Sequence, residues 1–337
     1  MSGYLRYLGG RLVIFVVTVF ISITVVFVIP RLVPGDPLGA ISIKLSQVGG
    51  NLGSRALIDE YMHRFGLDKS VPEQYLAYLG QLAQGDLGYS ISNFPTRVQD
   101  MLASALPWTI GLLTVTTLMS WLLGSLIGAL SGWSGGRSRR LQVLVPIALV
   151  LYTTPYYILA IILVFLLAYL WPIFPLSGAY TVGLRPDLSP SFILDVLRHG
   201  ILPALSIILV SLGWWFLSMR SLIITLKGED YMLWAEAIGL PPRKIFWAYA
   251  FRNALLPQVT GLALSLGNIV AGALITETIF GYPGIGFLVY TAIKGLDFPV
   301  IQGCILLVIL SVATANLLLD LAYPLIDPRI RFGAAGR

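Results

Sequence analysis

Long apolar stretches separated by short polar segments dominate the chain. Six of them are long enough to cross a bilayer as helices, which takes about 20 mostly apolar residues. They cover residues 12–29, 106–133, 141–171, 201–222, 254–279 and 300–323. The first follows Arg11, as a secretory signal would, but it is longer than a signal core and lacks a small-x-small cleavage site, so we interpret it as a retained span. The pattern predicts an all-α integral membrane protein with six transmembrane helices.

Composition supports this class and excludes others. Only 11% of the 337 residues are charged and 57% are hydrophobic, and the mean hydropathy is +0.83. Soluble domains carry about 25% charged residues, so this chain has too little charge for a water-exposed surface, and it is too apolar to be disordered. The single cysteine, Cys304, excludes a disulfide framework and a cysteine-based metal cluster.

Charge is distributed unequally between the predicted loops. With six spans, basic residues gather on one side: Arg6, Arg11, Arg137, Arg139, Arg140, Arg220, Lys227, Arg243, Lys244, Arg252, Arg329, Arg331 and Arg337. Acidic and basic residues are nearly balanced on the other side. The positive-inside rule therefore predicts cytoplasmic N and C termini. The net charge of +6 is explained by sidedness and needs no nucleic-acid partner.

The spans divide the chain into four parts. Residues 1–30 hold the N-terminal tail and first helix, 31–105 an extracytoplasmic helical segment, 106–326 a core of five helices, and 327–337 a cytoplasmic tail. Within the core, the polar stretch 227–253 is too long for a turn and forms a cytoplasmic loop. We expect 31–105 to be a small folded cap, because aromatic and leucine side chains recur along it.

The sequence offers no catalytic constellation. Its two histidines, His63 and His199, fall in predicted extracytoplasmic loops, and neither HExxH nor a phosphate-binding GxxxxGK[ST] occurs. Residues 132–136 match the GxSxG pattern, but they follow a membrane helix on the side opposite the histidines, so we interpret them as a flexible helix exit. We assign no catalytic residue, metal or cofactor to this chain.

Two acidic residues lie within predicted spans, where ionisable groups are expensive and often functional. Glu277 is near the outer end of the fifth span, and either contacts substrate, acts in a gate, or has a structural role. Asp320 is near the inner end of the sixth, where we expect a structural role and a tail arginine as partner.

Small and polar residues follow helical spacing in two spans. Gly124, Gly128 and Gly132 share one face of the second span, which permits close helix packing. In the fifth span, Asn268, Gly272 and Thr276 share another face. That face either lines a water-filled path, with Glu277, or makes ordinary packing contacts.

The loop 227–253 contains a predicted short helix. Asp230 is a suitable N-cap, residues 231–238 make two turns, and Gly239 suits the C-terminal end before two prolines. Held between two spans, such a helix either docks onto another protein or lies on lipid.

The same loop carries a family resemblance. Asp230-Tyr231-x-x-x-Ala235-x-Ala237-x-Gly239-Leu240, followed by Arg252-Asn253-Ala254-Leu255-Leu256-Pro257, resembles the EAA loop of ABC importer permeases. Further segments resemble B-type permease subunits of the oligopeptide/dipeptide/nickel branch, in the same order: 34–37, 66–68, 72–75, 85–88, 277–280, 283–286 and 327–329. Leu233 occupies the position of the loop's eponymous glutamate, so Glu236 is not given that role.

The resemblance implies an ABC type I importer permease fold and a set of partners. These are a second permease subunit of C type, two ATPase subunits that bind ATP and Mg, an extracytoplasmic substrate-binding protein, and membrane lipid. The resemblance assigns contact with the ATPase to seven residues: Asp230, Tyr231, Ala235, Ala237, Gly239, Leu240 and Arg243. The small side chains of the two alanines would let the ATPase subunit approach the helix closely. Di- or oligopeptides are the expected cargo, with nickel chelates or oligosaccharides as alternatives. A secondary transporter or an intramembrane enzyme is the competing class.

Overall fold

The computed structural model describes residues 2–32, 69–136, 138–187, 189–267, 269 and 273–326. This part of the chain is almost entirely helical, and its only strand-like feature is an isolated bridge between Tyr89 and Arg97. The helices group into two compact units, Met1–Trp108 with Gly284–Arg337, and Thr109–Pro283. The first contains both ends of the chain, and the second is formed by the middle of the sequence.

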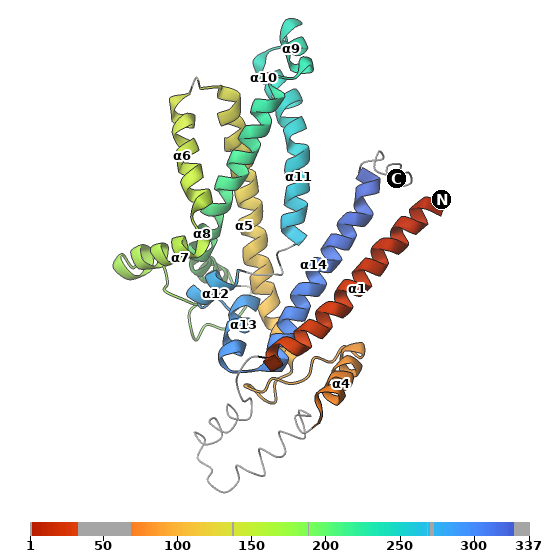
Figure 1. Ribbon diagram of the computed structural model, residues 1–337. Coiled ribbons are helices and arrows are strands. Elements are labelled where there is room, and N and C mark those ends of the chain that lie inside the picture. The colour runs from red at the N-terminus through yellow and green to blue at the C-terminus, as the bar shows by residue number, and fades with distance from the viewer. Residues whose placement is uncertain are drawn as a thin grey trace. The chain divides into compact units, whose positions relative to one another are not determined.

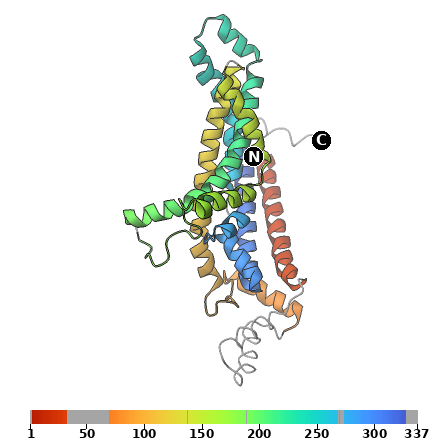
Figure 2. The same ribbon diagram turned by 90° about the vertical axis from the view of Figure 1, so that its left-hand side faces the viewer.

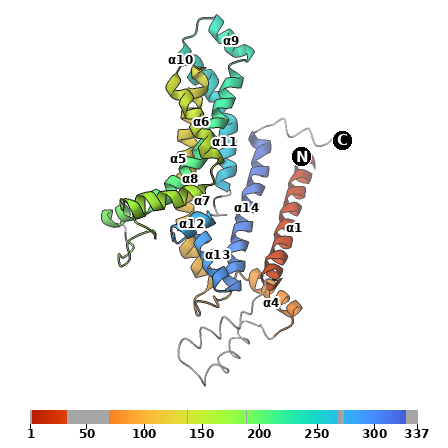
Figure 3. The same cartoon turned by 60° about the vertical axis from the view of Figure 1, so that its left-hand side comes forward.

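In the first unit, the N-terminal helix α1 (Ser2–Leu32) packs lengthwise on the C-terminal helix α14 (Phe298–Ile326), and the two run antiparallel (Figures 1 and 3). The unit also contains α4 (Val71–Ala83), α13 (Ile285–Lys294) and the beginning of α5 (Val98–Ser134). Its core lies between α5, α13 and α14, where Val98, Ile285 and Val300 are at most 1% exposed.

A buried carboxylate ties a loop of this unit to α14. Asp297 is 1% exposed and accepts hydrogen bonds from the hydroxyl of Ser90 and from the backbone N–H groups of Ile91 and Ser92, at 3.1 and 2.9 Å for the last two. It also accepts from the N–H of Val300 at 3.4 Å, within the first turn of α14. One side chain therefore caps a helix and fixes residues 90–92.

The second unit is built around α8 (Pro190–Leu226), which packs against α6 (Arg139–Thr153) and α7 (Tyr156–Val164). The contact with α6 is very close, because a β-carbon at Gly213 would lie 2.6 Å from the carbonyl oxygen of Ala148. After α8 come α9 (Asp230–Ala237), α10 (Pro242–Lys244), η2 (Ile245–Phe251), α11 (Arg252–Gly267) and α12 (Leu274–Ile279).

The predicted third span is not one straight helix. α6 ends at Thr153, and α7 with its π-helical continuation η1 (Phe165–Leu170) leaves at 98° to it, so that α7 projects sideways within its unit (Figure 2). Pro155, which cannot donate a backbone hydrogen bond, occupies the break, whereas Pro146 is accommodated inside α6. Such a bent pair is either a broken span or a re-entrant loop.

Other boundaries also differ from expectation. Among the described residues, four helices are long and apolar enough to span a membrane, or five if the bent pair counts as one span. The predicted fifth span is divided between α11, of 16 residues, and α12. α8 begins eleven residues before the predicted start at 201, so His199 lies inside a helix, 8% exposed, and its assignment to a loop was wrong.

Candidate functional site

The loop 227–253 folds into a rigid helical connection. α9 ends in a Schellman motif: the N–H of Leu240 binds the carbonyl of Ala235 at 3.2 Å, and the N–H of Gly239 binds that of Glu236 at 3.0 Å. Gly239 has a φ of +78°, in the left-handed region, so its backbone demands glycine more than any side-chain contact does. The predicted helix and its terminating glycine are confirmed, but Glu229 and not Asp230 occupies the N-cap.

One face of α9 is packed into the second unit. Met232 and Ala235 are 1% and 0% exposed, and they join a core cluster formed by Ala129, Met219, Ile223, Ile245, Phe246, Ala250 and Ala254. Tyr231 and Leu240 are half-buried against this cluster. The cluster includes residues of α5, α8 and η2 and residue 254 of α11. α9 itself packs mainly on η2, which connects it to the rest of the cluster.

The opposite face of α9 is apolar and exposed. Leu233, Trp234 and Ile238 are 56%, 62% and 51% exposed, and Ala237 lies beside them. Sequence analysis gave none of these three residues a contact role, although it noted Leu233 at the position of the eponymous glutamate, because a family pattern weights the small residues and not the large ones. Their signal was present, since a solvated helix turn is normally polar and this one contains a tryptophan and two large aliphatic residues. Exposed apolar patches of this kind mark contact surfaces.

The residues predicted for coupling differ in exposure to solvent. Four are exposed, namely Asp230, Ala237, Gly239 and Arg243, and three are buried or half-buried, namely Tyr231, Ala235 and Leu240. Ala235 is completely buried against its own chain, so the expectation that its small side chain lets a partner approach closely was wrong. Its size instead lets α9 approach the core cluster.

Two polar contacts fix the ends of this connection. Lys227, at the end of α8, donates to the carbonyl of Trp133 at 3.1 Å and lies 5.2 Å from the centre of that indole ring. Asn253 donates to the Tyr231 hydroxyl at 3.3 Å. The first contact anchors the loop to the end of α5, and the second joins α9 to the beginning of α11.

The GxSxG match has the geometry of a helix end. Ser134 donates its hydroxyl proton to the carbonyl of Ser131 at 2.9 Å, and the following Gly135 and Gly136 have φ angles of +54° and +90°. These features support the interpretation of residues 132–136 as a helix exit. Of the two histidines, His199 lies within α8, and His63 lies outside the described residues. Within the described ranges, no three His, Cys, Asp or Glu side chains gather as a metal site would require.

Glu277 occupies a buried position in α12. Its side chain is 0% exposed and accepts a 2.8 Å hydrogen bond from the hydroxyl of Thr109 in α5. The adjacent Thr276 is also 0% exposed. Neither side chain is open to a path in this conformation, which favours a structural or gate role over direct substrate contact. Asn268 and Gly272, predicted to share that face, lie outside the described residues.

The three glycines of α5 lie against α8. A β-carbon at Gly124 would be 2.6 Å from the β-carbon of Trp215, and one at Gly132 would be 2.8 Å from a backbone oxygen of α8. At Gly128 it would overlap the carbonyl oxygen of Phe216. The absence of side chains at these positions therefore sets the distance between the two helices.

Asp320 pairs with a residue of the first helix. Its carboxylate lies 3.1 Å from the guanidinium of Arg11, and its carbonyl accepts from the Tyr7 hydroxyl at 3.2 Å. The arginines of 327–337, expected as its partners, lie outside the described residues. The pair joins α1 to α14, as a structural role requires.

Long apolar helices with buried polar contacts between them define a multi-span membrane protein. Comparison with known proteins gives the family. Residues 122–332 match the binding-protein-dependent transport system inner membrane component family. The chain belongs to this family, and it is a multi-pass permease of the bacterial inner membrane.

Relatives span almost the entire chain. The di/tripeptide transport system permease protein DppB of Pseudomonas aeruginosa is 34% identical, with 97% of this chain and 99% of the relative covered. The probable D,D-dipeptide transport system permease protein DdpB of Escherichia coli is 35% identical, with 92% of each covered. The dipeptide transport system permease protein DppB of Escherichia coli is 32% identical, with 94% and 96% covered. Membership of the family implies a substrate-binding protein and ATPase subunits as partners.

Proposed function

We propose that the chain is a B-type permease subunit that imports di- and oligopeptides and provides half of the translocation path. The names of its relatives support this cargo, since all three refer to dipeptides or tripeptides. Nickel chelates or oligosaccharides are the alternative cargo within the same importer class. A secondary transporter and an intramembrane enzyme are less well supported, because the family works with a binding protein.

The proposed topology keeps six spans and cytoplasmic termini in a type I importer permease fold. α1, α5, α8 and α14 supply four spans, the bent pair from α6 to η1 a fifth, and the region from α11 to α12 the sixth. The concentration of basic residues on one side supports the orientation. The parts 1–30, 31–105, 106–326 and 327–337 keep their proposed roles, with 227–253 as the coupling loop.

Coupling to an ATPase subunit rests on one observation, the exposed apolar face of α9. Leu233, Trp234 and Ile238 form a surface that water solvates poorly, on a helix whose other face belongs to the buried cluster. A partner that covers this surface gains apolar burial worth about 25 cal/mol per Å². Because α9 packs on η2, and η2 shares the cluster with α5, α8 and α11, a push on the exposed face would reach those helices through η2. Asp230, Ala237 and Arg243 lie at the rim of the proposed contact, while Tyr231, Ala235, Gly239 and Leu240 hold its shape.

The proposed gate includes Asn268, Gly272, Thr276 and Glu277. Complete burial of the last two supports a closed arrangement, in which their polar groups are withheld from the path. Opening would then have to break the contact between Glu277 and Thr109.

The remaining proposals concern partners and chemistry. We propose a heterodimer with a C-type permease, above two ATPase subunits and below an extracytoplasmic binding protein. This chain is non-catalytic and binds no cofactor of its own, because ATP and Mg belong to the ATPase subunits. It contacts membrane lipid but no nucleic acid.

The test is reconstitution with the partner subunits in liposomes, with uptake of labelled dipeptide, nickel chelate and oligosaccharide measured with ATP and with ADP. ATP-dependent uptake of peptide alone is the expected result. Trp234→Ala should reduce uptake at least fivefold and lower ATPase stimulation by the loaded binding protein. Trp171→Ala is the matched control, since this tryptophan is 57% exposed and lies at the end of η1. Peptide uptake without ATP would support a secondary transporter, and unchanged coupling in Trp234→Ala would overturn the docking role of α9.

A further inference from the structure

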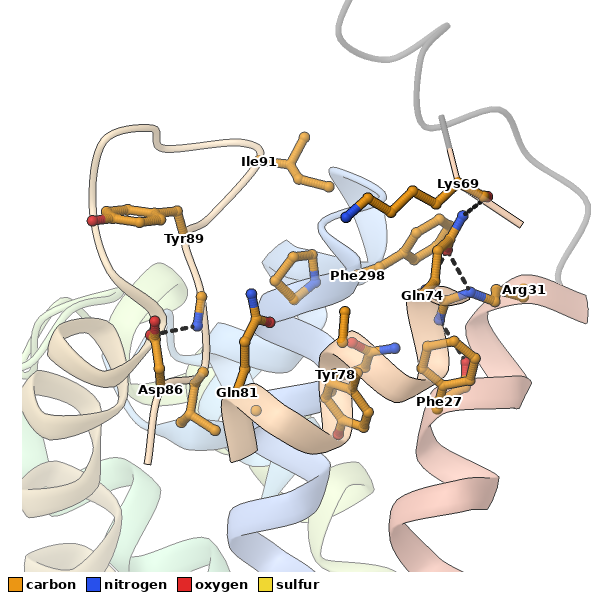
Figure 4. A pocket seen from close by; sticks show the side chains of 16 residues that line it. Phe27, Arg31, Lys69, Gln74, Tyr78, Gln81, Asp86, Tyr89, Ile91 and Phe298 are labelled. Atoms are coloured by element: carbon orange, nitrogen blue, oxygen red, sulfur yellow. Dashed lines mark hydrogen bonds between the residues drawn. The ribbon is translucent and has the colours of Figure 1, made fainter. Parts of the chain in front are cut away.

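A cavity in the first unit has no role in the proposed transport cycle. Its volume is about 280 Å³, and it lies between α4, the end of α1 and the beginning of α14 (Figure 4). Tyr78 and Gln81 of α4 line one side, and Gln302 of α14 lines another. Lys69 reaches across the opening, as the figure shows, and Arg31 closes the side formed by α1.

Two buried donors in this cavity lack partners. The side-chain nitrogen of Gln302 and the hydroxyl of Tyr78 are inaccessible to solvent and make no hydrogen bond to any part of the chain that the structure describes. Gln302 as a whole is 8% exposed. Burial raises the pKa of Tyr78 to about 12, so the hydroxyl keeps its proton and remains a donor at neutral pH. Leaving such groups unsatisfied costs about 1–3 kcal/mol each, which a ligand with acceptor oxygens would recover.

The lining of the cavity contains two basic side chains, Arg31 and Lys69, and one acidic side chain, Asp86. Arg31 is held by two bonds to the Gln74 amide oxygen, at 2.9 and 3.3 Å, and by one to the Phe27 carbonyl. Within the described ranges, neither Arg31 nor Lys69 has a carboxylate within ion-pair distance, although Lys69 is near enough to Glu73 to help lower the pKa of that carboxyl. Asp86 is the acidic residue of the lining, and its carboxylate is engaged by the N–H of Gly88 at 3.0 Å. Two cations against one anion favour a negatively charged ligand.

The position of the cavity along the spans identifies the source of that ligand. The apolar window of α1 ends at Ile29, just before Arg31, and the window of α14 starts at Phe298, which lines the cavity. α4 exposes Val71 and Leu76, by 56% and 68%, as an interfacial helix does. The cavity therefore lies where the apolar spans end, at the depth of lipid headgroups.

We propose that this cavity binds the phosphate group of an anionic phospholipid, with its acyl chains along the exposed apolar face of α1. Lys69 and Arg31 supply the charge, and Gln302 and Tyr78 donate hydrogen bonds to the phosphate oxygens. Ile21, Val25 and Val28, which are 55%, 44% and 40% exposed, form an apolar stripe on the flank of α1 beside Arg31 and offer the chains an apolar surface. The proposal requires only the membrane location of the chain and is independent of its cargo and of coupling.

Native mass spectrometry of the full-length chain in detergent provides the test. The chain is titrated with phosphatidylglycerol, diacylglycerol, glycerol 3-phosphate and inorganic phosphate in separate experiments. We expect retention of phosphatidylglycerol, reduced at least fivefold in Lys69→Gln and in Gln302→Leu. Lys294→Gln is the control, since this exposed lysine belongs to the same unit but not to the cavity. Lys69 is exposed, so its substitution does not threaten folding, and the melting temperature of each variant is measured alongside.

Three outcomes overturn the proposal. Equal retention of phosphatidylglycerol by the wild type and both cavity variants would show that the lipid binds elsewhere. Equal retention of diacylglycerol would show that the phosphate is not recognised. Binding of free phosphate or glycerol 3-phosphate at the same concentration, with the same dependence on Lys69 and Gln302, would assign the cavity to a soluble anion.

Discussion

The hydroxyl of Thr109 donates a 2.8 Å hydrogen bond to the carboxylate of Glu277, joining α5 to α12 across 168 positions of sequence. Both side chains are 0% exposed. A buried carboxylate depends strongly on its donors, because desolvation without hydrogen bonds disfavours it. This contact therefore stabilises the fold through the same residue, Glu277, that we propose as part of the gate.

Thr109→Val keeps the shape of the threonine and removes the donor. We expect a loss of about 1–3 kcal/mol in the free energy of unfolding, the usual cost of leaving a buried acceptor without its partner. Thermal melting in detergent measures it. Thr116→Val is the control, because Thr116 is equally buried in α5 but donates to a backbone carbonyl of its own helix. An equal loss of stability in both variants would show that the contact with Glu277 contributes no more than a hydrogen bond within the helix.

Gly239→Ala should weaken coupling through the backbone alone. No atom lies within 4 Å of a β-carbon placed there, so the φ of +78° is the sole obstacle, and it costs about 1–2 kcal/mol in a non-glycine residue. ATP-driven uptake by the reconstituted importer should fall, and Gly239→Asn should restore most of it, because asparagine tolerates this conformation. Gly228→Ala, in the same loop without a positive φ, should leave uptake unchanged. Failure of asparagine to rescue would point to a partner contact at Gly239.

Gly128→Ala and Gly111→Ala form a matched pair in one helix. At Gly128 the added methyl group overlaps the Phe216 carbonyl oxygen, whereas at Gly111 nothing lies within 4 Å. We expect Gly128→Ala to force α5 and α8 apart and to lower the melting temperature. Gly111→Ala should raise it slightly, by the roughly 0.5–1 kcal/mol that alanine gains over glycine in a helix. A neutral result at position 128 would show that the two helices separate without cost.

Asp297→Asn should loosen the loop that Asp297 holds. The amide keeps one acceptor oxygen and loses the other, and each oxygen accepts two bonds, so either Ser90 and Ser92 or Ile91 and Val300 lose their acceptor. Hydrogen exchange of peptides covering residues 88–94 should accelerate at least tenfold. Asp187→Asn is the control, because this exposed residue bonds only within its own turn. Unchanged exchange would mean that the loop is fixed by other contacts.

The start of α4 should depend on acid. The Ser70 hydroxyl and backbone N–H both bond to the Glu73 carboxylate, at 2.8 and 3.0 Å, and the hydroxyl contributes most to lowering the pKa of Glu73 below its ordinary 4.5. Because the folded-state pKa is the lower one, this stabilisation is complete above pH 4.5 and is lost as the pH falls through the folded value. Exchange protection of α4, corrected for intrinsic rates, should fall accordingly. Glu73→Gln should remove this pH dependence, and its persistence would assign the effect to another group.

Sequence reasoning was most successful where local rules determine structure. The helix of the coupling loop and its end at Gly239 follow from short-range signals, and so do the apolar lengths of α1, α5, α8 and α14. The 98° bend before α7 could not be predicted, because Pro155 indicates a break but not the direction of the chain beyond it. The burial of Ala235 could not be predicted either, because a family pattern does not say which face of α9 packs against the rest of the chain.

Long-range polar contacts were the main omission. Sequence analysis assigned no role to Asp297, whose partner Ser90 lies 207 positions earlier. A local signal did exist, because an aspartate followed two positions later by Pro299 and an apolar run is typical of a helix start. Asp320 illustrates the same limit, since the sequence indicated a basic partner but not that Arg11 would provide it.

The contacts of Asp297 also set an order on biosynthesis. The loop at Ser90–Ser92 leaves the ribosome long before Asp297 is translated, and Asp297 itself precedes the last span. Until Asp297 is translated, the Ser90 hydroxyl and the N–H groups of Ile91 and Ser92 cannot make their native hydrogen bonds, although the local bond from the Ser90 N–H to Thr96 needs no later residue. The loop can therefore reach its complete set of native contacts only after the start of α14 has been synthesised.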